Sequence, residues 1–433
     1  MKYYSLNNKK HHSNFENAVV RGLAPDKGLY FPERIPQLSI EFISNLKKLD
    51  PAEIGMQVIS PFVGNEIPET ELQKIVEETL SFDFPVKAIE PDISVLELFH
   101  GPTLAFKDVG ARFMAGSLGY FIQKGNLGKV TVLVATSGDT GGAVANGFLG
   151  VDGIDVVILY PKGKVSEIQE KQLTTLGQNI QAIEVDGTFD DCQGMVKKAF
   201  LDSEITERRQ LTSANSINLA RWLPQVFYYF LAYRQLETNN KIAFSVPSGN
   251  FGNICAGLLA KKMGLPIDTF VAANNANDTV TRFMESQDYQ AKQSVQTISN
   301  AMDVGDPSNF VRILELFGNH FKDLKKHLMA MSYTDSETNA AIRSVYEKHN
   351  YLMDPHGAVG YLGLKDFLKI NPEYSGVFLE TAHPVKFLKT VENASGAKVD
   401  MPESIAGIMD KKKKSFQLST YAELKEFLLE DYR

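Results

Sequence analysis

The sequence predicts an α/β protein with buried parallel strands, and three features support that prediction. From about Lys129 onward, short runs of β-branched and apolar residues alternate with longer segments of helical composition. This alternation is typical of parallel βαβ units. Glycine-rich turns follow two of the runs, and 433 residues are enough for two or three domains. Parallel strands of this kind are covered by helices on both faces.

Six apolar runs are expected to be strands, and five segments between them are expected to be helices. The expected strands are Val130–Ala135, Ile154–Tyr160, Ile180–Val185, Lys241–Val246, Pro266–Ala273 and Gly376–Leu379. The expected helices are Gly141–Phe148, Val165–Leu176, Asp190–Leu201, Ser216–Leu236 and Phe251–Met263.

The segment before Leu96 is rich in helix starts, for example at Ser39 and Pro68, and is expected to be a separate unit. The short lysine run Lys411–Lys414, before the amphipathic segment Tyr421–Leu429, is expected to be a solvated face. The expected division is an N-terminal module over 1–85, an α/β core over 86–395 with a smaller subdomain inserted at about 112–220, and a C-terminal extension over 396–433.

Composition excludes several classes of function. There are 45 Lys and Arg against 52 Asp and Glu, a net charge of −7, so a nucleic-acid partner is not expected. The two cysteines, Cys192 and Cys255, lie far apart, which excludes a disulfide framework and a cysteine-rich metal module. No apolar run approaches the roughly 20 residues of a membrane span, and the N-terminus lacks a signal-peptide core. We expect a cytoplasmic protein, monomeric or homodimeric, without a membrane partner.

Two segments share one pattern, in which a buried strand, a Ser-Gly-x-x-Gly turn and a helix follow one another. They are Val132–Gly141 and Phe244–Gly252. Glycines allow close approach of the backbone, and the N–H groups at the start of a helix attract an anion. Neither loop has the Walker A or the Rossmann spacing, so NTP and NAD are not favoured. The carboxylate of Asp139 would repel a phosphate, which makes the second loop the better phosphate site.

A third segment, Leu98–Asp108, carries a lysine just beyond an apolar run. Lys107 follows Leu104-Ala105-Phe106 and leads into an expected helix. A lysine in a partly apolar pocket is more often neutral, which suits it to forming a Schiff base with a carbonyl cofactor. A surface lysine and two ordinary βα turns remain the alternative when each feature is taken alone.

Taken together, the segments resemble the threonine synthase family, which are pyridoxal-phosphate enzymes of the tryptophan-synthase-β fold group. The matching segments occur in the family's order along nearly the whole chain. They are Gly28–Pro32 (GLYFP), His100–Asp108 (HGPTLAFKD), Ala135–Gly141 (ATSGDTG), Ser213–Asn218 (SANSIN), Val246–Gly252 (VPSGNFG) and Thr381–Pro384 (TAHP).

The resemblance implies two open parallel-sheet domains of fold type II with pyridoxal 5'-phosphate between them, and no metal. It implies that Lys107 bonds to the cofactor and later moves protons, that Thr381 places its hydroxyl against the pyridine nitrogen, and that Asp139 faces the ring hydroxyl. The residues implied for the cofactor phosphate are Ser248, Gly249, Asn250, Phe251, Gly252 and Asn253.

The resemblance further implies a site for the substrate. Ser137 and Thr140 would receive its carboxylate, and Asn215 and Arg221 its phosphate, because an arginine fork suits phosphate oxygens. Lys162 and Lys164 are weaker candidates for the same positive pocket. The implied reaction converts O-phospho-L-homoserine and water to L-threonine and phosphate, the last step of threonine biosynthesis.

Other functions on the same scaffold stay open at this point. A serine/threonine dehydratase or a phosphohomoserine lyase would share the cofactor-binding segments, and only the product separates them. A catalytically silent binding protein is the alternative from a different class, although the intact Lys107 and glycine loops argue against it.

Overall fold

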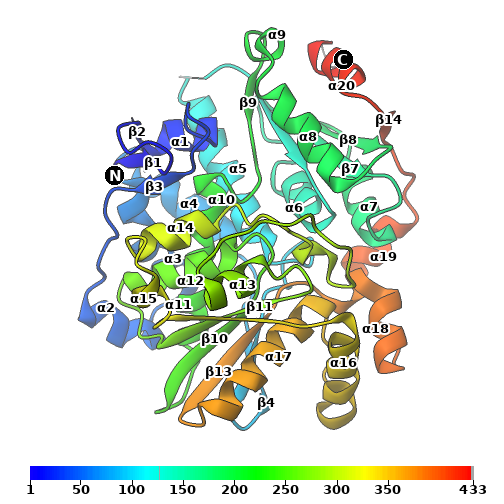
Figure 1. The fold of residues 1–433 in the computed structure, drawn as a ribbon. Coiled ribbons are helices and arrows are strands. Elements are labelled where there is room, and N and C mark those ends of the chain that lie inside the picture. The colour runs from blue at the N-terminus through cyan, green and yellow to red at the C-terminus, as the bar shows by residue number, and fades with distance from the viewer. Residues whose placement is uncertain (126, 431–433) are drawn as a thin grey trace.

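A computed structural model of the chain describes residues 1–125 and 127–430 (Figure 1). Residue 126, in the expected smaller subdomain, and residues 431–433, at the end of the expected C-terminal extension, lie outside the described residues. Sheets of six, five and three strands organise the described chain. In Figure 1 the six-stranded sheet lies at the bottom, the five-stranded sheet at the upper right and the three-stranded sheet at the upper left.

The six-stranded sheet has the order β12-β11-β10-β13-β5-β4. Its neighbouring strands are parallel, except for the antiparallel pair of β4 and β5. Its strands are β4 (Val86–Glu90), β5 (Ile93–Glu97), β10 (Lys241–Pro247), β11 (Thr269–Asn274), β12 (Leu328–Ser332) and β13 (Tyr374–Glu380).

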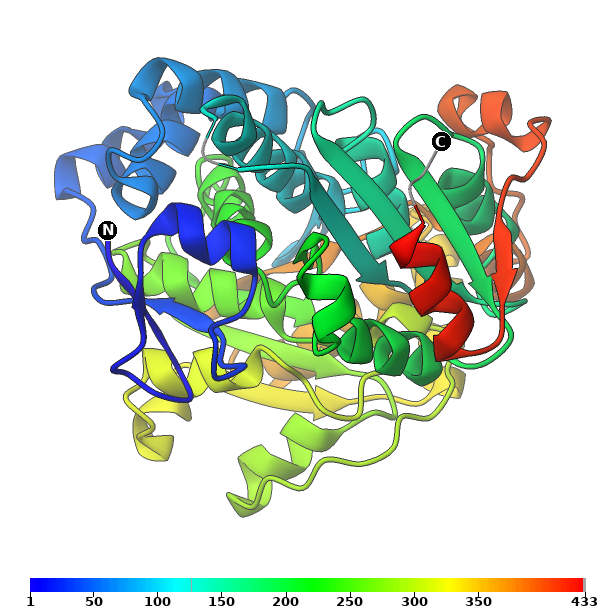
Figure 2. The same cartoon turned by 90° about the horizontal axis from the view of Figure 1, so that it is seen from above.

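The five-stranded sheet has the order β14-β8-β7-β6-β9 and is parallel throughout. Its outer strand β14 comes from the C-terminal segment, and α20 (Tyr421–Leu429) packs beside α8 (Phe189–Ala199), as Figure 2 shows. The tail of the chain therefore completes this smaller domain. Its strands are β6 (Val130–Ala135), β7 (Ile154–Pro161), β8 (Ile180–Val185), β9 (Gln210–Thr212) and β14 (Phe416–Leu418).

The N-terminal part forms a small antiparallel sheet of order β2-β1-β3, followed by helices. Its hydrophobic residues join the largest core cluster, which continues under both larger sheets. Its elements are β1 (Tyr3–Ser5), β2 (His12–Ser13), α1 (Phe15–Arg21), β3 (Tyr30–Pro32), α2 (Ile40–Asn45), η1 (Leu46–Lys48), α3 (Pro51–Val63) and α4 (Glu69–Thr79).

The remaining helices cover the two larger sheets. None of the helices within residues 1–125 and 127–430 is both long and apolar enough to cross a membrane. Besides α8 and α20 they are α5 (Lys107–Gln123), α6 (Asp139–Gly147), α7 (Glu167–Thr174), α9 (Ser203–Thr206), α10 (Leu219–Trp222), η2 (Leu223–Val226), α11 (Phe227–Tyr233), α12 (Gly252–Lys262), α13 (Thr279–Ser286), η3 (Asn300–Met302), α14 (Phe310–Leu316), α15 (Phe321–Leu324), α16 (Asp335–His349), α17 (Pro355–Ile370), η4 (Pro384–Phe387), α18 (Leu388–Ser395) and α19 (Glu403–Met409).

The predicted fold class is confirmed, because all strand pairs of the two larger sheets are parallel except β4 with β5, and helices pack against both sheets. All six expected strands exist, with ends that differ by at most a few residues. The single helix expected over Ser216–Leu236 is wrong. The chain there forms α10, the 3-10 turn η2 and α11 in succession. Pro224 lies in η2, and proline supplies no backbone N–H for a continuous α-helix.

Candidate functional site

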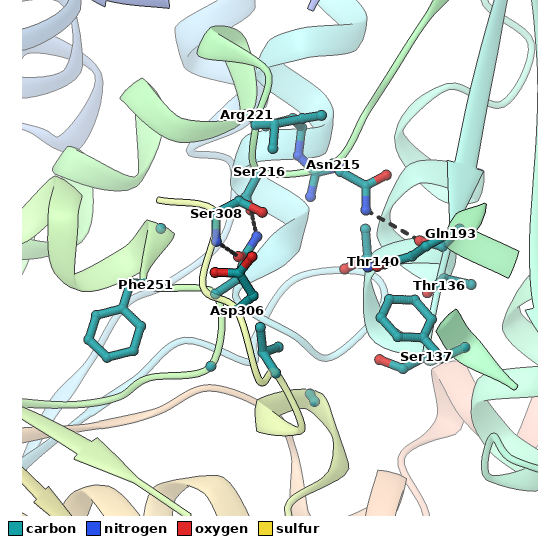
Figure 3. Close-up of a pocket in the computed structure, with 18 of the residues that line it drawn as sticks. Thr136, Ser137, Thr140, Gln193, Asn215, Ser216, Arg221, Phe251, Asp306 and Ser308 are labelled. Carbon is teal, nitrogen blue, oxygen red and sulfur yellow. Dashed lines mark hydrogen bonds between the residues drawn. The ribbon is translucent and has the colours of Figure 1, made fainter. Parts of the chain in front are cut away.

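A cavity of about 870 Å³ lies where the carboxyl ends of the parallel strands of the two larger sheets meet. Loops that follow β6, β10 and β13 line it, together with the start of α5. Ligands of open α/β sheets bind at this edge. Apart from the two weaker candidates Lys162 and Lys164, every residue predicted for the cofactor and the substrate lines this cavity, and Figure 3 shows Ser137, Thr140, Asn215, Arg221 and Phe251 around it. Lys162 and Lys164 are exposed and do not line the cavity, so that part of the prediction is wrong.

Lys107 is the first residue of α5, and its side chain is partly exposed to the cavity. Burial is the main reason why the pKa of Lys107 is lowered to about 8; the carboxylate of Asp139 opposes this effect, and the positive charges of Arg221 and Lys386 add to it. Within the described part of the chain, the Lys107 ammonium has no hydrogen-bond partner, and it lies 5.6 Å from the centre of the Phe106 ring. An amine of this kind is available for bonding to a carbonyl group.

Asp139 begins α6 and is buried on the floor of the cavity. One carboxylate oxygen, Oδ1, accepts hydrogen bonds from Lys386 Nζ at 2.8 Å and from Gln169 Nε2 at 2.9 Å. Burial alone would raise the pKa of Asp139, but the ammonium groups of Lys386 and Lys107 hold it well below its ordinary value. Asp139 is therefore an anion in this site, and its second oxygen, Oδ2, has no hydrogen bond to a described residue.

The loop from Ser248 to Asn253 connects β10 to the start of α12. Gly249 packs so closely against the chain that an added Cβ would lie 2.7 Å from Met302 Cα. Phe251 adopts a left-handed conformation with φ 60°. Among the described residues, the backbone N–H groups of 249–253 have no hydrogen-bond acceptor. These donors and the helix dipole together form an anion site at the start of α12.

A buried amide adds a further donor to the same loop. Asn253 accepts a hydrogen bond from the Tyr229 hydroxyl at its Oδ1, at 2.8 Å. Its Nδ2 is buried and has no partner in the described part of the chain. A buried unpaired donor is uncommon, because it costs about 1–3 kcal/mol. Its place in the cavity wall, beside the free N–H groups, suits a phosphate group with several acceptor oxygens.

The loop after β6 presents a second set of backbone donors. The Thr136 hydroxyl oxygen accepts from the N–H groups of Gly138 and Gly141 at 2.9 and 2.8 Å, and so fixes the turn. Gly138 has φ 132°, and an added Cβ would lie 2.4 Å from Gln169 Cδ. Ser137 and Thr140 lie on this turn and line the cavity (Figure 3). The turn suits a small anion such as a carboxylate.

Arg221, on α10, is buried in the cavity wall with an incomplete set of hydrogen bonds. Its Nη2 donates to the carbonyl oxygen of Lys107 at 3.5 Å, whereas Nε and Nη1 are buried and have no partner within residues 1–125 and 127–430. Burial lowers the pKa of Arg221 to about 10, which leaves the guanidinium charged at neutral pH. A buried cation with free donors requires an anion in the cavity to compensate it.

Two further predicted residues stand at the edges of this pocket. Asn215 donates to the carbonyl oxygen of Ala135 at 3.3 Å, so it lies between Arg221 and the loop after β6 (Figure 3). Thr381 directly follows β13 and lines the opposite side. Its carbonyl oxygen accepts from Phe106 N at 2.9 Å, which ties it to the segment that carries Lys107.

Sequence reasoning missed several residues that touch the site. Lys386 is buried behind the cavity wall, where it bonds to Asp139, and its only sequence signal is its place two residues after the Thr381–Pro384 motif. His356 also lines the cavity. It bonds to Asp354 through Nδ1, and its Nε2 accepts from Ala301 N at 3.2 Å. Gln169 is the third residue of α7 and forms a capping box with Ser166, which is a sequence signal for a helix start and not for a site.

Comparison with known families and proteins gives one consistent result along the chain. The family described as "Pyridoxal-phosphate dependent enzyme" matches residues 84–380. The families "Threonine synthase N terminus" and "Threonine synthase, C-terminal" match residues 2–80 and 357–428.

Individual relatives match over nearly the full length. The threonine synthase of Buchnera aphidicola from Acyrthosiphon pisum is 46% identical over 99% of this chain and 100% of its own. The crystal structure of threonine synthase from Escherichia coli superposes with a TM-score of 0.93 at 44% identity, covering 99% of both chains. A structure of threonine synthase from Brucella melitensis, described as PLP bound, gives 0.92 at 37% identity over 99% of this chain and 98% of that one.

Proposed function

The chain belongs to the threonine synthase family of pyridoxal-phosphate enzymes, and on that premise we propose that its cavity converts O-phospho-L-homoserine and water into L-threonine and phosphate. This reaction makes it a carbon–oxygen lyase acting on a phosphate ester. The observation that carries the proposal is Arg221, whose buried guanidinium has two unpaired donor nitrogens in the cavity that also holds Lys107. A substrate phosphate supplies the missing acceptors.

The residues present fit pyridoxal phosphate. Lys107 provides an amine, the Ser248–Asn253 loop provides free N–H groups, and Asn253 Nδ2 is an unpaired buried donor. We propose that this loop binds the cofactor phosphate, that Thr381 faces the pyridine nitrogen, and that Asp139 faces the ring hydroxyl. When bound, pyridoxal phosphate acts as an electron sink and makes the protons next to the substrate's amino carbon acidic.

Lys107 is proposed to move the protons of the reaction at its Nζ. A pKa of about 8 in place of 10.5 raises the neutral fraction of the amine at neutral pH by about 300-fold. The neutral amine accepts a proton, and the ammonium that forms returns it. Its place at the first turn of α5, beside Phe106 and without a hydrogen-bond partner among the described residues, leaves Nζ free to reach the substrate.

The substrate is proposed to be held at both ends by the smaller domain and α10. Backbone N–H groups of the Ser137–Gly141 turn, together with the Thr140 hydroxyl, bind its carboxylate. Arg221 and Asn215 bind its phosphate and stabilise the charge that leaves with it. Holding the phosphate apart from the cofactor loop orients the breaking bond and makes the enzyme selective for phosphorylated substrates.

We further propose the division into the N-terminal module 1–85, the core 86–395 and the extension 396–433, with the smaller subdomain at about 112–220. Action in the cytoplasm, as a monomer or homodimer without a nucleic-acid partner, is part of the same proposal. The net charge of −7 and the two buried free cysteines support it.

Product analysis tests the proposed reaction. The purified holoenzyme is incubated with O-phospho-L-homoserine, and threonine and inorganic phosphate should form in equal amounts. Release of 2-oxobutyrate in place of threonine would make the protein a phosphohomoserine lyase. Turnover of serine or threonine, with none of the phosphate ester, would make it a dehydratase.

A further inference from the structure

Lys386 is a buried lysine that no predicted role accounts for. It lies on the short turn η4 after β13, and its side chain is fully buried. A buried ammonium is costly unless it is paired and hydrogen-bonded. Lys386 Nζ meets both conditions, because it lies 2.8 Å from Asp139 Oδ1 and donates to the carbonyl oxygen of Thr103 at 2.8 Å.

The partner of Lys386 is the carboxylate of Asp139, which lines the cavity that also holds Lys107. Two donors, Lys386 and Gln169, fix the same oxygen of Asp139. The carboxylate therefore has a set orientation in which Oδ2 is left for the cavity. Asp139 belongs to the five-stranded sheet's domain and Lys386 to that of the six-stranded sheet, so the contact crosses between the two domains.

The contact between Lys386 and Asp139 affects the charge balance around Lys107. Asp139 attracts a proton to Lys107, whereas Lys386 and Arg221 disfavour one. Another group nearby, Tyr228, donates its hydroxyl to the carbonyl oxygen of Phe106, and burial raises its pKa well above the ordinary value, so it stays neutral. Without Lys386, the cation left to attract Asp139 is Lys107 itself.

We propose that Lys386 is a positioning residue, which engages the Asp139 carboxylate and so prevents it from pairing with the Lys107 amine. The role rests on the proposed function in one respect, namely that Lys107 must exchange protons. Lys386 does not touch the reacting atoms. It acts through Asp139, because it orients the Asp139 carboxylate and partly neutralises its negative charge.

A purely structural role is the competing explanation, because the same contact joins two domains. Breaking a buried ion pair destabilises a protein whether or not it serves catalysis. The two explanations differ in what they predict for Lys107. If the contact is only structural, replacing Lys386 changes the melting temperature alone. If Lys386 is a positioning residue, replacing it also changes the proton affinity of the Lys107 nitrogen.

The test uses five holoenzymes: wild type, Lys386→Met, Lys386→Arg, Asp139→Asn, and the double variant Lys386→Met with Asp139→Asn. The first readout is the pH midpoint of the visible absorbance of the cofactor linked to Lys107, recorded without substrate. The second is the acidic limb of kcat against pH, and the third is the melting temperature. Because the first readout needs no substrate, it is independent of the product assay that tests the proposed function.

The expected results follow from the charges. Lys386→Met should move the midpoint and the acidic limb to higher pH, by about one pH unit or more, because an unscreened carboxylate favours the protonated nitrogen. Asp139→Asn should move the midpoint to lower pH, the double variant should return it toward the wild-type value, and Lys386→Arg should leave it in place.

The proposal is overturned if Lys386→Met lowers the melting temperature while its midpoint and limb stay at the wild-type pH. It is also overturned if the double variant shows no return. Should Lys386→Met fail to fold, Lys386→Gln replaces it, because an amide can still donate a hydrogen bond to Asp139 while the positive charge is lost. The midpoint must then be higher in Lys386→Gln than in the wild type, and equal midpoints reject the role.

Discussion

The hydroxyl of Tyr229 donates to the side-chain oxygen of Asn253 at 2.8 Å, which leaves the amide nitrogen of Asn253 as the half without a partner. Burial raises the pKa of Tyr229 well above its ordinary value, so the phenol stays protonated and always acts as the donor. The oxygen and nitrogen of a side-chain amide can exchange places with little change in shape. The hydrogen bond from Tyr229 therefore fixes which of the two faces the cavity. A side chain on α11 thus aims a donor on α12 into the cavity.

Asn253→Asp should weaken cofactor binding, because it replaces the unpaired donor with a carboxylate beside the cofactor phosphate. Loss of a hydrogen bond to a charged group costs about 1.5–3 kcal/mol, or roughly 10- to 150-fold in affinity. Titration of pyridoxal phosphate into cofactor-free protein measures this. Tyr229→Phe is the matched variant, since it removes the hydroxyl that bonds to Asn253 Oδ1 and to its carbonyl oxygen but keeps the amide donor, and its loss of affinity should be smaller. Unchanged affinity of Asn253→Asp would place the phosphate elsewhere.

Gly249→Ala should disturb the phosphate loop, because the new Cβ meets a backbone atom, Met302 Cα, at 2.7 Å. Backbone cannot move aside as a flexible side chain can, so Met302 and η3 must shift. We expect weaker cofactor binding together with a lower melting temperature. Gly194→Ala on α8 is the control, because its Cβ meets nothing within 4 Å. Alanine there should leave binding unchanged and stabilise the helix by about 0.5–1 kcal/mol.

Strands were predictable from the sequence where hydrophobic and β-branched composition alone determines the local structure. Val130–Ala135 and Ile180–Val185 form strands with the expected ends, because β-branched residues buried on both faces leave no other solution. Leu328–Ser332 was missed, since Leu-Met-Ala-Met-Ser has no β-branched residue and its strand depends on pairing with β11. Helical composition alone could not show the division of Ser216–Leu236.

The site was predictable only where a motif marks the backbone. The two glycine turns and Lys107 stand in recognisable segments, and the structure brings them to one cavity. Lys386 and Gln169 were missed because each is an ordinary polar residue in sequence. Lys386 reaches Asp139 from the other domain, and Gln169 reaches it from the neighbouring helix α7, and no local pattern encodes either contact.

The rate at which Lys107 bonds to its cofactor should depend on pH. Only the neutral amine attacks a carbonyl group, and burial lowers the pKa of Lys107 to about 8. Below that pH the neutral fraction falls about tenfold for each pH unit, and above it the fraction is nearly constant. The growth of the visible band after pyridoxal phosphate is added to cofactor-free protein should therefore accelerate up to about pH 8 and then level off. Lys107→Ala should show no such band, and a rate independent of pH would contradict the assignment.

Two buried arginines near the site differ in the completeness of their hydrogen bonds. Arg312 is bonded through all three nitrogens, to Tyr30 O, Ser216 O, Ile217 O and Asn309 Oδ1, and it stacks on Trp222 at 4.5 Å. Its donors are used within the protein. Arg221 has two nitrogens left without partners. This contrast supports the proposed ligand-binding role of Arg221 and leads us to expect a structural role for Arg312.

Replacement of Arg221 should therefore affect the substrate and not the cofactor. Arg221→Lys keeps the charge but loses the planar fork, and Arg221→Ala loses both. Turnover of O-phospho-L-homoserine should fall from wild type to Lys to Ala, with the loss of a charge-assisted bond worth about 1.5–3 kcal/mol. Steady-state kinetics, the visible cofactor absorbance and the melting temperature are measured for each variant beside Arg312→Lys. The control variant Arg312→Lys should have a lower melting temperature than the wild type, because a lysine cannot donate to four carbonyl and amide oxygens at once. An Arg221→Ala enzyme with wild-type kinetics would reject the phosphate role. If Arg221→Ala instead lost the visible absorbance of the cofactor, Arg221 would be part of the cofactor site. The proposed cofactor-phosphate loop before α12 is a separate segment, so this loss is not expected.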